Sequence, residues 1–96
     1  MFETQVFYQL NEKHRKYYLI EKYVKDGYAT ITGIWGRLDA PGQKQIKYNG
    51  YDGWAGERVV NEIVETREKH GYTFYKKVNS PAPKTLTLTE AILANL

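Results

Sequence analysis

Trp35 and Arg37 stand two positions apart at the end of a stretch, Tyr28 to Arg37, whose residues alternate as in a β-strand. Side chains two positions apart leave a strand on the same face, so the indole and the guanidinium are expected to lie side by side. Together they could hold a phosphate and stack on an adjacent ring, which is the chemistry of nucleic-acid binding. The alternative interpretation is structural, with a core or edge-strand tryptophan and an arginine in a surface ion pair.

Lysines add positive charge close to this pair. Lys44 and Lys47 are three positions apart, so on a regular strand they fall on opposite faces and only one can share the face of Trp35. Residues 10–50 contain eight Lys and Arg against four Asp and Glu, whereas residues 51–70 contain three against five. The net charge of +3 is therefore concentrated in the front half of the chain. This asymmetry points mildly toward a polyanionic partner.

The elements that would position these residues follow from hydrophobic periodicity. Alternation predicts strands at residues 2–10, 17–24, 28–37, 45–48 and 72–78. Asp26-Gly27 is the clearest hairpin turn, because Gly accepts the positive φ that tight turns require. Connections this short make the strands antiparallel.

A change of period after residue 50 predicts one helix. Apolar residues recur at four-residue spacing from Ala55, in a stripe that continues to Arg67. Asp52 is a suitable N-cap and Gly71 a suitable stop, which places the helix at about residues 53–70. Trp54 is expected to pack against the sheet as a hydrophobic staple and so hold the start of the helix there. The fold class is therefore α+β, an antiparallel sheet of about five strands with one amphipathic helix packed across it.

Length and composition indicate one domain with a tail. The chain has 96 residues, which suits a single core. We assign residues 1–78 to the domain and residues 79–96 to a proline-containing linker with an apolar C-terminal tail. The tail is expected either to dock on the domain or to bind a partner protein.

Several spaced residues resemble one known family. They are Lys16-Tyr17-Tyr18-Leu19-Ile20, Trp35-Gly36-Arg37, Gly42-Gln43, Ala55, Glu68-Lys69 and Gly71-Tyr72. This order, over residues 16–76, resembles the WGR domain of DNA-dependent poly(ADP-ribose) polymerases and of bacterial proteins of the molybdate-regulator type. The resemblance implies an antiparallel sheet with a helix across it. It also implies binding to a DNA end, where the signature tryptophan stacks on a nucleotide and the arginine contacts DNA and neighbouring domains.

The resemblance and the basic residues together give a predicted binding site. Carried onto this chain, the family signature nominates Trp35 and Arg37, and the turn and strand start upstream add Asn11 and Lys16. With the residues that follow the signature, the predicted nucleic-acid-binding set is Trp35, Arg37, Lys44, Lys47, Gln43, Lys16 and Asn11. We expect DNA to be preferred to RNA. The alternative function is a protein–protein adaptor that uses the same face or the tail.

Other classes of function find little support in the sequence. Without cysteine there are no disulfides or thiolate metal sites. Ser80, the single serine, precedes a proline, and His14 and His70 each lack a second ligand at metal spacing. We therefore expect no enzymatic activity, no metal or other cofactor and no small-molecule substrate. No apolar run approaches the ~18 residues of a membrane span, so we expect no membrane association and a cytoplasmic location, or a nuclear one in a eukaryote.

Overall fold

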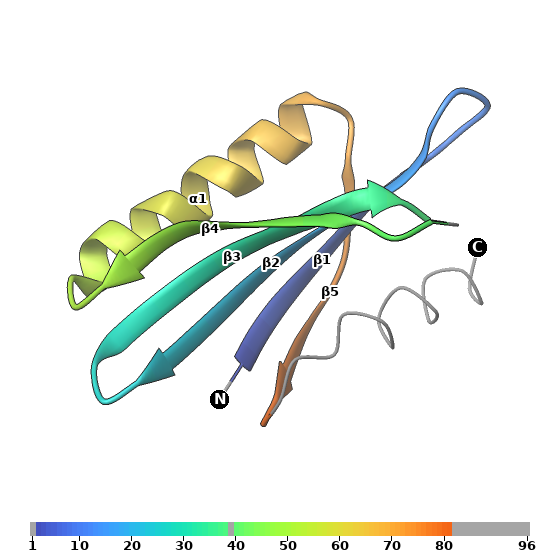
Figure 1. Cartoon of the computed structure of the whole chain (residues 1–96). Helices are drawn as coiled ribbons and strands as arrows, with labels where there is room; N and C mark the ends of the chain where they lie inside the picture. The colour runs from blue at the N-terminus through green and yellow to red at the C-terminus, as the bar shows by residue number, and fades with distance from the viewer. Residues whose placement is uncertain (1, 39, 82–96) are drawn as a thin grey trace.

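The computed structural model describes residues 2–38 and 40–81, which form a five-stranded antiparallel sheet with one helix on one of its faces (Figure 1). The elements are β1 (Phe2–Leu10), β2 (Arg15–Lys25), β3 (Tyr28–Arg37), β4 (Gln43–Gly50), α1 (Gly53–Lys69) and β5 (Thr73–Ser80). The strand order is β4-β3-β2-β1-β5, so β4 and β5 form the two edges. This architecture confirms the predicted α+β class with its single helix packed across the sheet.

Two tight turns set the register of the first three strands. Asp26 and Gly27 have φ of 52° and 80°, the left-handed values that a two-residue hairpin turn requires. The side-chain oxygen of Asn11 accepts hydrogen bonds from the backbone N–H groups of Lys13 (2.8 Å) and His14 (2.9 Å) and so closes the β1–β2 turn. The resulting register pairs Tyr18 with Trp35 and Lys16 with Arg37 across β2 and β3.

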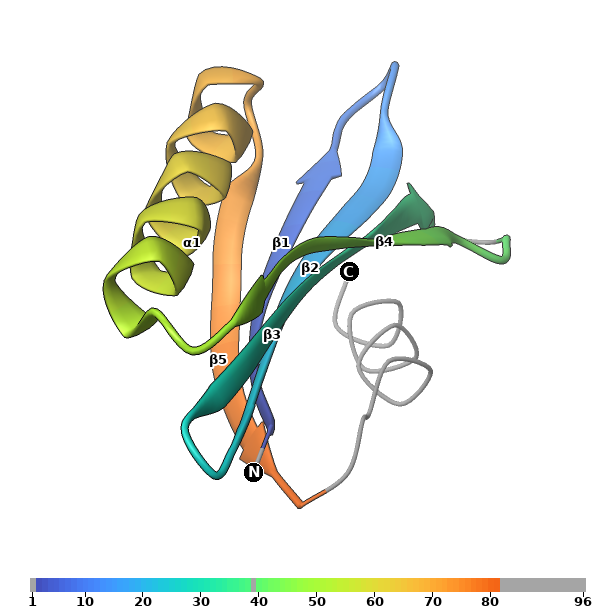
Figure 2. The same ribbon diagram turned by 60° about the vertical axis from the view of Figure 1, so that its left-hand side comes forward.

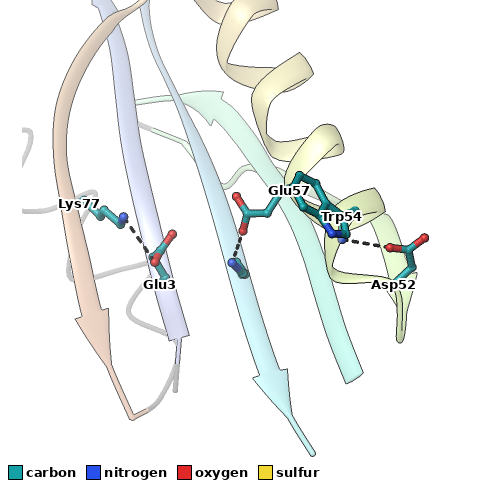
Figure 3. A network of polar contacts seen from close by, with 6 residues as sticks. Glu3, Asp52, Trp54, Glu57 and Lys77 are labelled. Carbon is teal, nitrogen blue, oxygen red and sulfur yellow. Dashed lines mark hydrogen bonds and ion pairs between the residues drawn. The ribbon is translucent and has the colours of Figure 1, made fainter. Parts of the chain in front are cut away.

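Helix α1 carries the chain from the β4 edge to the β5 edge and lies across the sheet on the way (Figure 2). Its start is fixed by Asp52, whose carboxylate accepts the backbone N–H groups of Trp54 and Ala55 at 3.0 and 3.1 Å (Figure 3). The chain leaves the helix through Gly71, whose φ is 86°. The predicted cap, stop and span are therefore confirmed to within one residue.

The expected role of Trp54 was wrong, because its side chain is 84% exposed. Trp54 lies six positions before the buried Val60, which places it about 120° around the helix from the residues that face the sheet. The apolar positions further along α1 therefore hold the helix on the sheet without help from this indole.

The face beneath α1, the helix face, has its own hydrophobic core. Phe7, Tyr18, Ile20, Ile31 and Val60 are buried there. The partly buried Trp35, Tyr48, Val59, Ile63, Val64 and Tyr72 pack around them. Residues of four strands thus meet one helix, and the cluster extends to the ring of Trp35.

The opposite face of the sheet, the second face, holds a separate core. Val6 and Leu19 have no exposed surface, and Tyr17, Ile34 and Leu38 are buried with them. As predicted from alternation, Tyr17 and Leu19 point to one side of β2, and Tyr18 and Ile20 to the other. The sheet is therefore apolar on both sides.

Strand β5 runs two residues further than the sequence predicts. We placed the end of the domain at residue 78, but Ser80 still pairs with Phe2 and is buried. The reason is tertiary, since β1 extends to Phe2 and offers partners that local composition does not reveal. The rest of the predicted linker and tail, residues 82–96, lies outside the described residues.

Glu21 lies on the second face, and burial of its carboxylate there lowers the stability of the fold. Burial raises the pKa of its carboxyl group, while the charge of Lys44 opposes this, and Oε2 is buried with no hydrogen-bond partner among the described residues. Glu21→Gln removes the charge, so we expect the free energy of unfolding at pH 7 to increase by on the order of 1 kcal/mol.

The pH dependence of this gain follows from the direction of the shift. A raised pKa means that the folded state favours protonated Glu21, so stability is lost as the pH rises through the folded-state pKa. The difference in free energy of unfolding between the Gln variant and the wild type should therefore disappear below the ordinary carboxyl pKa, at about pH 3.5. Urea unfolding at both pH values measures it, and a wild type as stable as the variant at pH 7 would contradict the expectation.

Candidate functional site

Three aromatic rings line the helix face near the C-terminal end of α1. Tyr18 and Trp35 are cross-strand partners whose rings are nearly parallel, with centroids 5.9 Å apart and an interplanar angle of 10°. Tyr72, just before β5, meets Tyr18 edge-on at 6.5 Å. Trp35 and Tyr72 are half-buried. Their rings therefore both complete the core and reach the surface.

Three cations are interleaved with these rings. The Arg67 guanidinium carbon lies 4.5 Å from the Tyr18 ring centroid and 5.2 Å from that of Tyr72. The Lys47 ammonium lies 5.2 Å from the Trp35 ring centroid, and that of Lys16 lies 5.3 Å from that of Tyr72. Such distances allow cation–π attraction, which holds each charge above a ring. The cation–aromatic cluster consists of Lys16, Tyr18, Trp35, Lys47, Arg67 and Tyr72.

Strand alternation brings Lys47 to this cluster, because Gln43 is opposite Trp35 and residues 43, 45 and 47 share that face. The register between β3 and β4 shifts after the Ile31–Tyr48 pair, so that Thr32 is opposite Ile46 and Lys47 has no cross-strand partner in this register. Gly33 supplies the room, because a Cβ there would lie 2.4 Å from the Tyr18 hydroxyl and 3.1 Å from Cε of Lys47. The missing side chain at position 33 therefore lets Lys47 reach the Trp35 ring.

Arg67 is held between two tyrosines in a partly buried position. Its Nε is buried and has no hydrogen-bond partner among the described residues, so part of its donor capacity is unused there. Burial raises the pKa of the Tyr18 and Tyr72 hydroxyls, and the Arg67 charge opposes the rise in each case. Both rings are therefore neutral at physiological pH, and the cluster carries only positive charge.

A basic hollow adjoins the cation–aromatic cluster. It has a volume of about 300 Å³ and is lined by Glu12, Lys13, His14, Arg15, Lys16 and Arg37. The Lys16–Arg37 pair lies two residues along the strands from the Tyr18–Trp35 pair. Two residues correspond to about 7 Å of strand on the same face. Since Lys16 belongs to both, cluster and hollow form one continuous surface on which cations outnumber the two carboxylates, Glu12 and Glu62.

Two glycines shape the end of β3. Gly36 lies between Trp35 and Arg37, and Gly42 directly precedes β4. A Cβ on Gly36 would lie 2.8 Å from the Cα of Gly42, and a Cβ on Gly42 would lie 2.1 Å from the Tyr17 hydroxyl. The backbone before and after the β3–β4 loop therefore approaches too closely for any side chain. This contact fixes the strand end from which Arg37 projects.

The structure brings most of the predicted site residues together. Trp35, Arg37, Lys16 and Lys47 line the cluster or the hollow, and Gln43 is the cross-strand partner of Trp35. Lys44 lies elsewhere, because it pairs with Ile34, whose side chain belongs to the second face. Asn11 begins the turn that carries Lys13 and His14 of the hollow, and its side-chain oxygen is occupied in closing that turn.

Sequence reasoning missed Tyr18, Arg67 and Tyr72 as members of the site. Arg67 carried a usable signal, because it occupies a position in the otherwise apolar stripe of the helix. A cation in such a stripe has its stem buried and its charge at the rim of the core. Tyr18 and Tyr72 gave no such signal, since tyrosines are frequent throughout this chain.

The described ranges contain neither a cluster of metal ligands nor a membrane-spanning helix. In residues 2–38 and 40–81, no three His, Asp or Glu side chains gather as they would around a metal ion. Within the same ranges, α1 is too short and too polar to cross a membrane. No protein-family model, no curated protein and no solved structure matches this chain.

Proposed function

We propose that this protein is a non-catalytic module that binds nucleic acid through the cation–aromatic cluster and the basic hollow. The observation that carries the proposal is the continuity of this surface, in which three cations alternate with three aromatic rings and lead into a hollow lined by further basic residues. Basic side chains attract the phosphate backbone, and rings at the rim offer stacking surface for a base or sugar.

The arrangement fits a mode of binding in which contacts to the phosphate backbone of the nucleic acid dominate. Lys16 and Arg37 are neighbours across β2 and β3, so the two charges can face consecutive phosphates of one strand. Arg67 is pre-oriented by Tyr18 and Tyr72, which lowers the entropy lost when it forms a hydrogen bond. Because we expect contacts to phosphates to dominate, we expect little sequence specificity. The resemblance to the WGR domain favours DNA, and a strand end in particular.

The test is fluorescence anisotropy with a labelled DNA duplex that has a recessed, 5′-phosphorylated end, measured across a salt series. We expect the wild type to bind with an affinity that falls steeply with salt, by about 0.9 log unit per log unit of salt for each phosphate contacted. In Lys16→Gln/Arg37→Gln the affinity should fall about tenfold or more, and the slope should decrease by about 1 to 2. Trp35→Ala is less suitable alone, because this side chain also packs in the core.

The chain offers a matched control. Lys25→Gln/Arg58→Gln also replaces one lysine and one arginine, at exposed positions at the far end of β2 and in the first half of α1. We expect its salt slope to stay close to that of the wild type. No binding by the wild type at low salt, or an equal loss in both double variants, would reject the proposal.

A protein adaptor is the second candidate, and one observation favours it. Large apolar side chains are exposed at the other end of the sheet, where Trp54 (84%) and Tyr51 (76%) stand near Tyr28 and Val24. The Tyr28 and Tyr51 rings form an edge-on pair with centroids 4.9 Å apart. Exposed patches of this kind mark protein-binding surfaces. Binding to a partner through them should tolerate salt that abolishes phosphate contacts.

A further inference from the structure

Helix α1 packs against β2, β3 and β4 (Figure 1), and a pocket lies between the helix and the sheet. This helix pocket has a volume of about 360 Å³, within the range of about 300–1,000 Å³ that is common for ligand pockets. It is lined by Tyr18, Lys47, Val59, Glu62, Ile63, Thr66 and Arg67. Tyr18, Lys47 and Arg67 also belong to the cation–aromatic cluster. The helix pocket therefore extends the surface that we propose to bind nucleic acid.

Two cations give the helix pocket hydrogen-bond donors on both of its sides. Lys47 projects from β4, and its ammonium donates to the side-chain oxygen of Gln45 at 2.8 Å. An ammonium group has three N–H donors, so donors remain for a ligand. Arg67 projects from α1 with its guanidinium above the Tyr18 ring, and its Nε has no hydrogen-bond partner among the described residues. A guanidinium plane of this kind is also a surface on which a base can stack.

Glu62 gives the same pocket a hydrogen-bond acceptor. Its side chain is exposed, and within residues 2–38 and 40–81 its carboxylate forms no ion pair, although Lys47 and Arg67 line the same pocket. The Thr66 hydroxyl donates to the backbone oxygen of Glu62 at 2.8 Å and so leaves the carboxylate available. A carboxylate repels phosphate and only accepts hydrogen bonds. Its position beside a basic surface therefore favours a ligand that presents N–H groups as well as acceptors.

We propose that the helix pocket takes the unpaired base at a nucleic-acid strand end, and that the base it prefers is guanine. Among the four bases, guanine alone presents two adjacent N–H donors beside an acceptor oxygen. Glu62 can accept from both donors, while Lys47 donates to the oxygen. Val59 and Ile63 are half-buried and supply apolar contacts for the ring. Unstacked bases are held in this way, by hydrogen bonds to their edges and by aromatic or apolar side chains at their faces.

The position of the helix pocket suits the end of a bound strand. The Lys16–Arg37 pair of the hollow is followed, two residues along the strands, by the Tyr18–Trp35 pair. Tyr18 in turn lines the helix pocket. A strand with phosphates at Lys16 and Arg37 thus has its next nucleotide close to the pocket. The inference rests on the proposed function, and it adds a preference at one unpaired position to binding that phosphates otherwise dominate.

Fluorescence anisotropy with a set of DNA duplexes tests the inference. All have the same recessed, 5′-phosphorylated end, and the protruding strand ends in one unpaired guanine, hypoxanthine, adenine or thymine. We expect the guanine end to bind wild-type protein about fivefold or more tightly than the adenine or thymine end. Hypoxanthine lacks the exocyclic amino group of guanine and should lose part of this preference. In Glu62→Gln all four duplexes should bind more tightly, because a negative charge is removed, but the preference for guanine should fall below about twofold.

Glu65→Gln is the matched control. It makes the same change of charge at an exposed position three residues further along α1, outside the lining of the helix pocket. It should keep the preference for guanine. Wild-type binding with the expected salt slope but equal affinity for the four ends would overturn the inference and leave the proposed function standing. An equal loss of preference in both variants would overturn it as well. No binding of any duplex at low salt would reject the proposed function and this inference with it.

Discussion

Leu19→Ala is expected to lower the free energy of unfolding by about 2–5 kcal/mol. Leu19 lies in β2, the central strand of the sheet, and has no exposed surface. Its side chain packs with Val6, Tyr17 and Ile34 from three adjacent strands, so truncation leaves a cavity that a regular sheet cannot collapse to fill. Urea unfolding followed by tyrosine and tryptophan fluorescence measures the loss.

A matched substitution separates burial from strand propensity. Ile46 lies in β4 and is 58% exposed, so Ile46→Ala removes a large aliphatic side chain from a strand without opening a cavity. We expect its cost to stay below about 1 kcal/mol. Similar losses at both positions would contradict the assignment of Leu19 to a packed core.

Gly42→Ala is expected to destabilise the protein by about 1–3 kcal/mol and to weaken DNA binding at the same time. The new Cβ would lie 2.1 Å from the hydroxyl of Tyr17 and 2.6 Å from the backbone oxygen of Trp35. Tyr17 is only 3% exposed and cannot swing away, so the backbone at the end of β3 must move. That movement displaces the strand end that carries Arg37.

Gly53→Ala is the control for this substitution. A Cβ at Gly53 meets nothing within 4 Å, and the residue begins α1, where alanine is compatible with the backbone. We expect unchanged or slightly higher stability and unchanged binding. Thermal unfolding and the anisotropy titration report the two effects separately. A Gly42→Ala variant that is as stable as Gly53→Ala would show that the close approach of the two backbone segments relaxes freely.

The fold was predictable where the signals were local. Alternation along β2 divided Tyr17 from Tyr18 correctly, and Asp26-Gly27 and Asp52 marked a turn and a helix start through their own backbone chemistry. The end of β5 was not predictable in this way. Ser80 is in a strand because Phe2 lies beside it, and that pairing joins residues 78 positions apart.

The candidate site was predictable only in part, for the same reason. The two-residue spacing of Trp35 and Arg37 and the basic composition nearby led to one surface. The choice between Lys44 and Lys47 depended on which residue of β4 lies opposite Trp35, a register that local composition does not reveal. Arg67 and Tyr72 join the site through the path of α1 across the sheet, which is a tertiary feature.

The edge positions of β4 and β5 have a consequence for how copies of this protein meet. Each edge strand offers a row of backbone N–H and C=O groups that no strand of residues 2–38 and 40–81 uses, which is a template for sheet extension and aggregation. Lys44 and Lys47 lie on one edge, and Lys76 and Lys77 lie on the other. Joining two copies edge to edge would bring these like charges close together, which disfavours growth of the sheet. Lys47 would thus have two roles, since the charge that we propose to contact a polyanion also disfavours pairing of the β4 edge with other sheets.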